Sequence, residues 1–206
     1  MQPDAYNAAR MEDKRAELMR GLREYMQRQP ERAAVAQQML DFVASTADCF
    51  ERSHAEGHIT GSAWLLNPGG DKALLTLHRK LGLWLQPGGH ADGDADVLRV
   101  ALREATEESG IEGISPLSRD IYDVDIHRIP AHPASGAPAH WHYDVRYLLR
   151  APHEACVISG ESIALRWFTH HELRQMSPPA DESVLRLARK IWGEAGSAQI
   201  PEKLAD

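Results

Sequence analysis

Residues 88–111 read GGHADGDADVLRVALREATEESGI, and this stretch predicts a glycine bend that leads into an amphipathic helix. An aspartate just before the helix can accept hydrogen bonds from its first turn. We expect the helix to end at Glu108 or Ser109, because Gly110 suits the left-handed position that follows a helix. The candidates for the N-terminal cap are Asp92, Asp94 and Asp96.

Three carboxylates crowd onto one side of this helix. Glu104, Glu107 and Glu108 stand at positions i, i+3 and i+4, so their side chains share a face and repel one another. Arg103, four residues before Glu107, relieves only part of that repulsion. Clustered carboxylate oxygens suit Mg²⁺ or Mn²⁺, which keep several waters and bridge to phosphate oxygens. The alternative explanation is a helix face washed by solvent.

The composition is that of a globular protein, and the net charge argues against one class of partner. The chain has 206 residues, and its formal net charge of −7 argues against duplex nucleic acid as the main partner. Two cysteines, Cys49 and Cys156, are too few for a disulfide framework, so we expect a reduced, cytoplasmic protein. No segment is fit for a signal peptide or long and apolar enough to span a membrane.

The hydrophobic pattern divides the chain into a helical part and a mixed part. From Tyr6 to Cys49 the spacing is helical with a break at Pro30, which predicts a hairpin of two helices. After Phe50 the pattern predicts strands, the helix above and a final helix. The expected strands cover residues 60–66, 73–77, 121–129, 141–149 and 164–169, and the final helix covers residues 180–196. The expected units are an N-terminal helical extension (1–50), one domain (51–196) and a loose tail (197–206).

The spacing of residues in the opening stretch resembles the Nudix box. The box requires a glycine, an Arg-Glu pair, an aliphatic residue, a Glu-Glu pair, a glycine and a final aliphatic residue at fixed intervals. Ala95 stands where the box has its first glutamate. The other positions are matched by Gly89, Arg103, Glu104, Ala105, Glu107, Glu108, Gly110 and Ile111. The similarity extends to a bacterial subgroup of Nudix proteins with a helical N-terminal extension, over about residues 10–192.

The resemblance implies an α/β fold, the Nudix α/β/α sandwich around a mixed sheet. It implies hydrolysis of a diphosphate linkage in a nucleoside diphosphate joined to a group X, by attack of water at phosphorus. Mg²⁺ or Mn²⁺ would be held by Glu104, Glu107 and Glu108 with the Gly89 carbonyl, and Arg103 would orient the carboxylates. Homodimers are common among such enzymes.

Two further roles stay open in the sequence. The catalytic base is Glu161 on a later loop, or one of the box residues Glu107 and Glu108. Because Ala95 replaces a glutamate, the alternative function is a nucleotide-binding module that hydrolyses its ligand weakly or not at all.

Histidines and one basic pair are the candidates for substrate contacts. Alternation puts His140, His142 and Asp144 on one face of a strand, with Trp141 and Tyr143 on the other. That spacing can bind a transition metal, line a cleft for phosphates or ribose, or form a hydrogen-bonded network. We expect the substrate, a nucleotide-derived small molecule, to contact Arg79, His90, His140 and His142, with Lys80, His127 and His132 as further candidates. Trp64, Trp84 and Trp167 are expected in the core.

Overall fold

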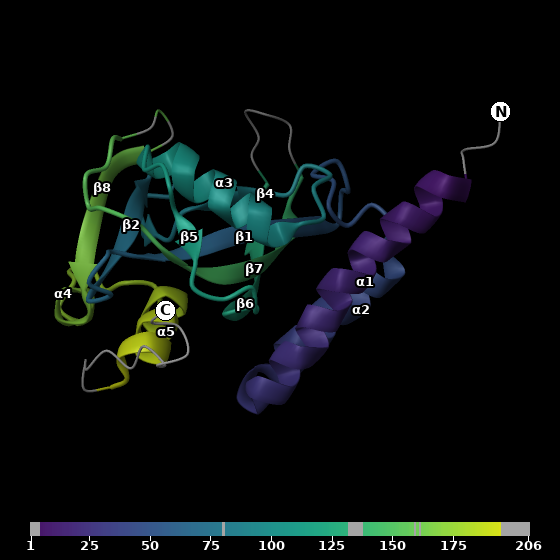
Figure 1. Ribbon diagram of the computed structural model, residues 1–206, viewed down its shortest axis with the longest axis horizontal. Helices are drawn as coiled ribbons and strands as arrows, with labels where there is room; N and C mark the ends of the chain where they lie inside the picture. The colour runs from purple at the N-terminus through teal and green to yellow at the C-terminus, as the bar shows by residue number, and fades with distance from the viewer. Residues whose placement is uncertain (1–4, 80, 132–137, 159, 161, 195–206) are drawn as a thin grey trace.

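A computed structural model gives the architecture of the chain and describes residues 5–79, 81–131, 138–158, 160 and 162–194 (Figure 1). Four expectations fall outside these ranges: Lys80, His132, Glu161 and the tail 197–206. Within the described residues, no helix is long and apolar enough to cross a membrane.

The N-terminal part is the helical hairpin that the pattern predicts. Helix α1 (Ala5–Arg28) is followed by a 3₁₀ turn (Pro30–Arg32) and helix α2 (Ala33–Ser45), so the break falls at Pro30 as expected. The second helix ends four residues earlier than predicted, because Thr46 adopts an extended conformation with φ −117° and ψ 107°. The two helices lie side by side at one end of the sheet (Figure 1).

One mixed sheet organises the rest of the described chain. The long strands β1 (Gly57–Leu66) and β7 (His140–Arg150) pair in parallel at its centre, and the other pairings are antiparallel. The sequence did not predict the short strands at 84–85, 88–90 and 115–116, because their pairing depends on distant partners. The remaining strands are β2 (Lys72–His78), β3 (Trp84–Leu85), β4 (Gly88–His90), β5 (Ser115–Pro116), β6 (Asp123–Ile129) and β8 (Ser162–Thr169).

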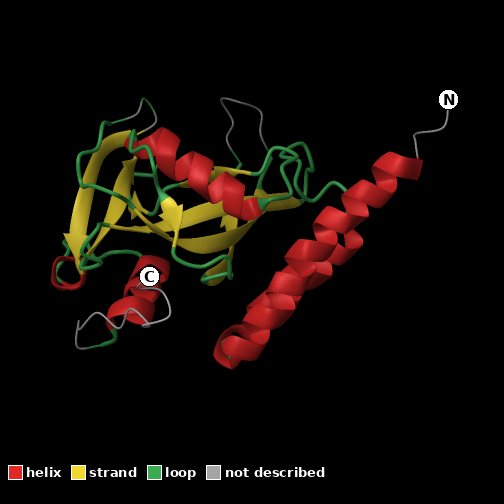
Figure 2. Ribbon diagram, in the orientation of Figure 1, coloured by secondary structure: helices red, strands yellow, loops and turns green. Residues whose placement is uncertain are grey.

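Helices cover both faces of this sheet (Figure 2). Strand β1 is buried along its whole length, and its alternate residues serve two cores. Ile59 packs in the core under α3 (Val97–Ser109), whereas Trp64 packs in the core under α5 (Glu182–Trp192). A short helix α4 (His170–Arg174) follows β8. The α/β/α sandwich with a mixed sheet and N-terminal helices is therefore confirmed.

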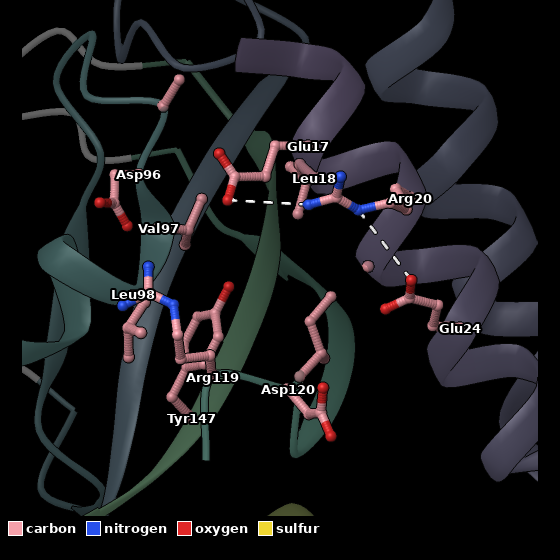
Figure 3. A pocket seen from close by; sticks show the side chains of 13 residues that line it. Glu17, Leu18, Arg20, Glu24, Asp96, Val97, Leu98, Arg119, Asp120 and Tyr147 are labelled. Carbon is pink, nitrogen blue, oxygen red and sulfur yellow. Dashed lines mark ion pairs between the residues drawn. The ribbon is translucent and has the colours of Figure 1, made fainter. Parts of the chain in front are cut away.

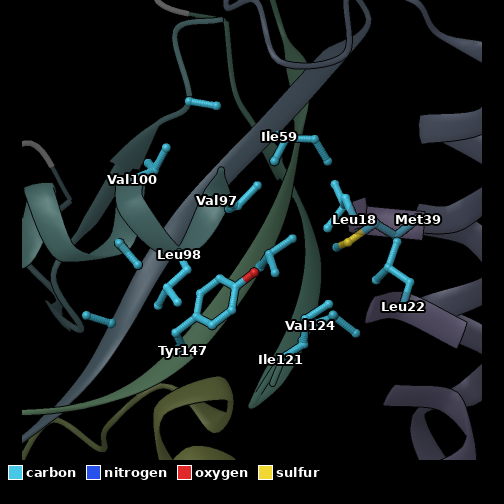
Figure 4. Close-up of a cluster of buried hydrophobic side chains, with 14 of the residues drawn as sticks. Leu18, Leu22, Met39, Ile59, Val97, Leu98, Val100, Ile121, Val124 and Tyr147 are labelled. Atoms are coloured by element: carbon cyan, nitrogen blue, oxygen red, sulfur yellow. The ribbon is translucent and has the colours of Figure 1, made fainter. Parts of the chain in front are cut away.

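The N-terminal hairpin shares the core under α3. Leu18 and Leu22 of α1 and Met39 of α2 belong to the same buried cluster as Ile59 and Val97 (Figure 4). Burying such side chains contributes about 1.5–3 kcal/mol each. The hairpin is thus packed against the sheet through apolar side chains.

The three tryptophans expected in the core differ in burial. Trp64 is fully buried, as predicted, and lies edge-on to Trp192 at a ring distance of 5.9 Å. Trp84 and Trp167 are only half-buried and pack at the margins of the two cores. Both strands that carry them, β3 and β8, pair with β2.

Charged side chains are also buried, in a network that joins the sheet to α5. The guanidinium of Arg146, only 2% exposed, lies 2.7 Å from Asp144, 3.4 Å from Asp125 and 3.6 Å from Asp123. Arg186 of α5 contacts Asp123 and Asp125 at 3.0 and 2.9 Å. Buried carboxylates are thereby matched by buried cations, as their desolvation requires.

This network predicts a loss of stability in acid. Burial by itself raises the pKa of Asp123. The positive charges of Lys190, Arg146 and Arg186 together lower this pKa by a larger amount, so the net shift is downward. A pKa depressed by folding stabilises the protein above the unfolded value of about 3.9, and this stabilisation is lost as pH falls below it. We expect the urea-derived free energy of unfolding to fall between about pH 5 and pH 3.

The comparison variant for this titration is Asp123→Asn. It cannot lose the same carboxylate charge in acid, so its free energy of unfolding should fall less steeply with pH than that of the wild type. Parallel curves for the two proteins would contradict the assignment.

Candidate active site

The glycine bend of β4 lies directly against the carboxylates of α3. The amide of Gly88 donates a hydrogen bond of 2.8 Å to Oε1 of Glu108. A Cβ atom on Gly89 would lie 2.5 Å from the Glu104 carboxylate, so only glycine allows this approach. The bend therefore brings backbone polar groups to two of the three box carboxylates.

Arg103 of α3 forms a hydrogen bond to the same bend. Its Nη2 donates to Oε1 of Glu104 and to the carbonyl of His90, each at 2.8 Å. The hydrogen bond to Glu104 raises the pKa of Arg103 and outweighs the lowering by burial. Arg103 thus holds one carboxylate in a fixed direction, the positioning that the resemblance implies.

The three box carboxylates do not converge as closely as their spacing suggested. Glu107 is exposed, while Glu104 and Glu108 are half-buried against β4. Among the described residues, these three do not form a group with ligand atoms all within 4.8 Å of one another. The reason is that Arg103 holds Glu104 and the Gly88 amide holds Glu108.

The chemistry of this donor set fits a hard divalent cation. The side-chain donors are carboxylate oxygens, which Mg²⁺ and Mn²⁺ prefer, and the close approach of Gly89 leaves its backbone beside Glu104. Nitrogen and sulfur ligands would point to a softer ion instead.

The close approach at Gly89 gives a prediction. In Gly89→Ala the new methyl group would displace Glu104 from the bend, and we expect metal-dependent activity or metal affinity to fall about 10- to 100-fold. Gly69→Ala is the control, because its Cβ would meet only the Asp71 and Asn67 side chains among the described residues, at 3.0 and 3.7 Å. Steady-state assays over a metal titration measure both variants, and equal activity in the two would contradict this role for Gly89.

The start of α3 is capped although Ala95 replaces the first box glutamate. Of the three candidate caps, Asp96 is the N-cap and accepts from the Arg99 amide at 3.1 Å, whereas Asp94 pairs with the Arg99 side chain. Ala95 is 8% exposed and faces a pocket of about 270 Å³ between α3 and α1 (Figure 3). Capping is therefore supplied by a neighbour of Ala95. Gly110 ends the helix with φ 68°, as predicted.

That pocket is separate from the residues expected to act on substrate. Its polar lining includes Glu17, Arg20 and Glu24 of α1 and Arg119 near β6, and Arg20 lies 4.0 Å from each of the two glutamates (Figure 3). The lining contains neither the box glutamates nor the histidines.

A group of histidines occupies the opposite face of β4 and its neighbours. His58 on β1 stands directly across from His142 on β7, and His142 stands across from His127 on β6. His90 on β4 and His140 on β7 complete the group, with ring distances of 5.0 Å from each to His58. We call these five residues the histidine cluster.

The cluster brings together three of the four residues predicted to contact substrate: His90, His140 and His142. The fourth, Arg79, follows β2 on an exposed position and is not part of the cluster. His140, His142 and Asp144 share one face as expected, since Asp144 accepts from Thr60 beside the cluster at 3.0 Å. On the other face, Tyr143 stacks on Phe42 at 3.9 Å.

His58 was not among the site residues predicted from the sequence. Its alternation with Thr60 was visible in GHITG, but only the parallel pairing of β1 with β7 places it beside His142. The sequence carried no signal for that pairing.

Two members of the cluster are kept neutral by their surroundings. Burial, and then the neighbouring His90 and His140, lower the pKa of His58 to about 4. Burial, and then the other four members, lower the pKa of His142 far below its usual value. At neutral pH both rings are therefore uncharged and carry a lone pair on one nitrogen.

The box geometry and the sandwich agree with the comparisons. The family model of the NUDIX domain matches residues 58–188. The chain belongs to the NUDIX family. Members of this family generally act as pyrophosphohydrolases and use a divalent metal ion.

Solved structures of hydrolases resemble 64–66% of the chain. A NUDIX-family hydrolase from Clostridium perfringens has 25% identity and a TM-score of 0.51, over 64% of this chain and 93% of that chain. A MutT NUDIX hydrolase from Burkholderia pseudomallei has 23% identity and a TM-score of 0.48, over 66% and 98%. An Ap4A hydrolase from C. elegans, in a binary complex, has 19% identity and a TM-score of 0.47, over 64% and 93%. Among curated proteins none gives a significant match.

Proposed function

We propose that this NUDIX protein is a Mg²⁺- or Mn²⁺-dependent hydrolase that cleaves the diphosphate linkage of a nucleoside diphosphate joined to a group X. The observation that carries the proposal is the contact of Gly89 with Glu104, which Arg103 fixes through hydrogen bonds of 2.8 Å. ADP-ribose, nucleotide sugars and dinucleotide polyphosphates are the substrate classes we propose.

Glu104, Glu107 and Glu108, with the Gly89 carbonyl, would hold the cation. When bound, it polarises phosphoryl oxygens, lowers the pKa of a water and neutralises charge on the leaving group. Arg103 fixes the direction of Glu104, and the Gly88 amide fixes Glu108. These contacts reduce the reorganisation that the site needs during the reaction.

The proton of the attacking water needs an acceptor. Glu107 is exposed on the helix and has the freedom to approach a bound substrate, so we propose it as the base among the box residues. Glu108 and Glu161 are the alternatives. For substrate contacts we propose Arg79, for the non-leaving phosphate, and His90. His140 and His142 were expected to join them, but their position beside His58 supports another role.

A substrate panel tests this function. Each class is incubated with Mg²⁺, with Mn²⁺ and with a chelator, in water enriched in ¹⁸O. We expect nucleoside monophosphate or phosphate to appear only with a divalent cation, and one product to carry ¹⁸O. Tight binding by calorimetry with no product under any cation would overturn hydrolysis and support the nucleotide-binding alternative.

Ala95 gives a second test of that alternative. We expect Ala95→Glu to change the hydrolysis rate by less than about tenfold, below the range typical for an outer contact of a metal site. The reason is that Asp96 already caps α3 and Ala95 faces the pocket toward α1. Ala95→Gln, which adds similar bulk without charge, is the control. A large gain in rate for the glutamate alone would instead mean that the natural protein is attenuated.

A further inference from the structure

Three side chains of the histidine cluster come close enough to share one ion. Candidate ligand nitrogens of His58, His140 and His142 all lie within 4.8 Å of one another. Two of them, Nε2 of His140 and Nε2 of His142, are 3.3 Å apart. Nitrogens bound to a tetrahedral zinc at about 2.0–2.1 Å are separated by about 3.3 Å. The pair thus already has the spacing of two ligands.

Hydrogen bonding prepares His140 for this role. One ring nitrogen, Nδ1, lies 2.9 Å from the carbonyl of Pro138, which can only accept, so Nδ1 carries the proton. The lone pair of the neutral ring is then on Nε2, the nitrogen that faces His142. A backbone carbonyl that fixes the tautomer in this way is the usual support of a metal-binding histidine.

His58 supplies an independent observation. It is 2% exposed, and neither of its ring nitrogens makes a hydrogen bond within the described protein. The backbone of His54 is near enough to raise the pKa of His58 slightly, without reaching hydrogen-bond geometry. A buried polar ring without a partner is costly, and coordination of an ion would satisfy it.

We propose that His58, His140 and His142 form a transition-metal site, best suited to Zn²⁺, that is distinct from the carboxylate site of the box. Three imidazoles select ions such as zinc, nickel or copper over Mg²⁺. Three protein ligands also leave a fourth position for water or another group. Binding needs the three nitrogens to close from within 4.8 Å to about 3.3 Å, a movement of about 1.5 Å at most.

Strand β4 separates this site from the box. Gly89 faces Glu104 on the α3 side, whereas the next residue, His90, has its ring 5.0 Å from His58 and 5.1 Å from His142. An ion at the histidines would join the parallel pair β1 and β7 beside the bend that carries the box. The proposal rests on the histidines themselves and does not depend on hydrolysis.

Metal binding is measured on the full chain, first stripped with a chelator and dialysed. After Zn²⁺ is added back and the excess is removed, we expect one Zn²⁺ per chain by mass spectrometry of the metal content. When Co²⁺ is added instead, we expect the visible absorption bands of tetrahedral Co²⁺. At a Zn²⁺ concentration of about 100 times Kd, the Tm should rise by about 5–10 °C. Millimolar Mg²⁺ should give neither the cobalt bands nor displacement of bound Zn²⁺.

Variants assign the ion to its ligands. His58→Leu and His140→Ala should each weaken Zn²⁺ binding at least tenfold and remove the tetrahedral cobalt bands. His140 is half-buried, so His140→Ala decides the question if His58→Leu does not fold. The matched control is His153→Ala, at an exposed histidine, which should bind as the wild type does.

A carboxylate variant separates the two sites. Glu107→Gln with Glu108→Gln should keep its Zn²⁺ and its cobalt bands, even if hydrolysis is lost. The proposal is overturned if the wild type takes up no Zn²⁺, if its cobalt spectrum is octahedral, or if His140→Ala binds as tightly as the wild type. Loss of Zn²⁺ binding in the carboxylate variant would likewise overturn it, because the ion would then belong to the box.

Discussion

Replacing Glu107 and Glu108 together by glutamine is expected to reduce metal-dependent turnover by on the order of 10²-fold or more, without unfolding the protein. The change keeps the size of both side chains and removes two of the negative charges that would hold the cation. Glu107 is exposed, and Glu108 is half-buried with its carboxylate on the Gly88 amide, so the apolar core under α3 is not disturbed. Initial rates with the substrate found in the panel measure the loss of turnover, and circular dichroism measures whether the protein stays folded.

The single variants sharpen this expectation. If Glu107 is the base, Glu107→Gln should lower kcat and flatten the acid side of the pH profile, whereas Glu108→Gln should chiefly raise the metal concentration needed. Glu112→Gln is the matched control, because Glu112 is an exposed glutamate just beyond Gly110. Unaltered rates in the double variant would sink the proposed hydrolysis mechanism.

Arg146→Met is expected to cost about 3–5 kcal/mol of stability. Methionine preserves much of the volume of the arginine stem but removes the charge that lies within 3.6 Å of three carboxylates, Asp123, Asp125 and Asp144. Asp144 is buried, so its charge would be left poorly compensated, whereas Asp123 would keep Arg186 and Lys190. Urea denaturation at pH 7 measures the change in the free energy of unfolding.

An exposed ion pair provides the control for this experiment. Arg20 and Glu24 of α1 approach to 4.0 Å with both side chains at least half exposed, and Glu24→Ala should change stability by less than about 1 kcal/mol. If Arg146→Met were as mild as Glu24→Ala, the buried network would not stabilise the fold by several kcal/mol as expected for a buried ion pair.

Elements that depend on neighbours in sequence could be predicted. The break at Pro30, the helix 97–109 and its end at Gly110 follow from local hydrogen bonding, turn preferences and the left-handed conformation. Strands were found where alternation was strong, but β1 was predicted to start at Thr60 and begins at Gly57. The short strands β3, β4 and β5 could not be predicted, because two or three residues carry no periodic pattern.

The candidate site was predicted unevenly for the same reason. The box residues lie within one loop and helix, so the contact of Gly89 with Glu104 and the position of Arg103 follow from one short stretch. The histidine cluster draws on four strands, and its most buried member, His58, was not among the candidates.

The sequence by itself determined the helix, its end at Gly110, the glycine bend and the resemblance to the Nudix box, since each depends on residues a few positions apart. Only the tertiary structure decided that His58 stands beside His142, that Arg146 is enclosed by three aspartates, and that Ala95 faces α1. The first two features depend on the register of strands far apart in the chain, and the third depends on the packing of α1 beside the start of α3. A shift of one residue in that register would turn every side chain to the opposite face of the sheet.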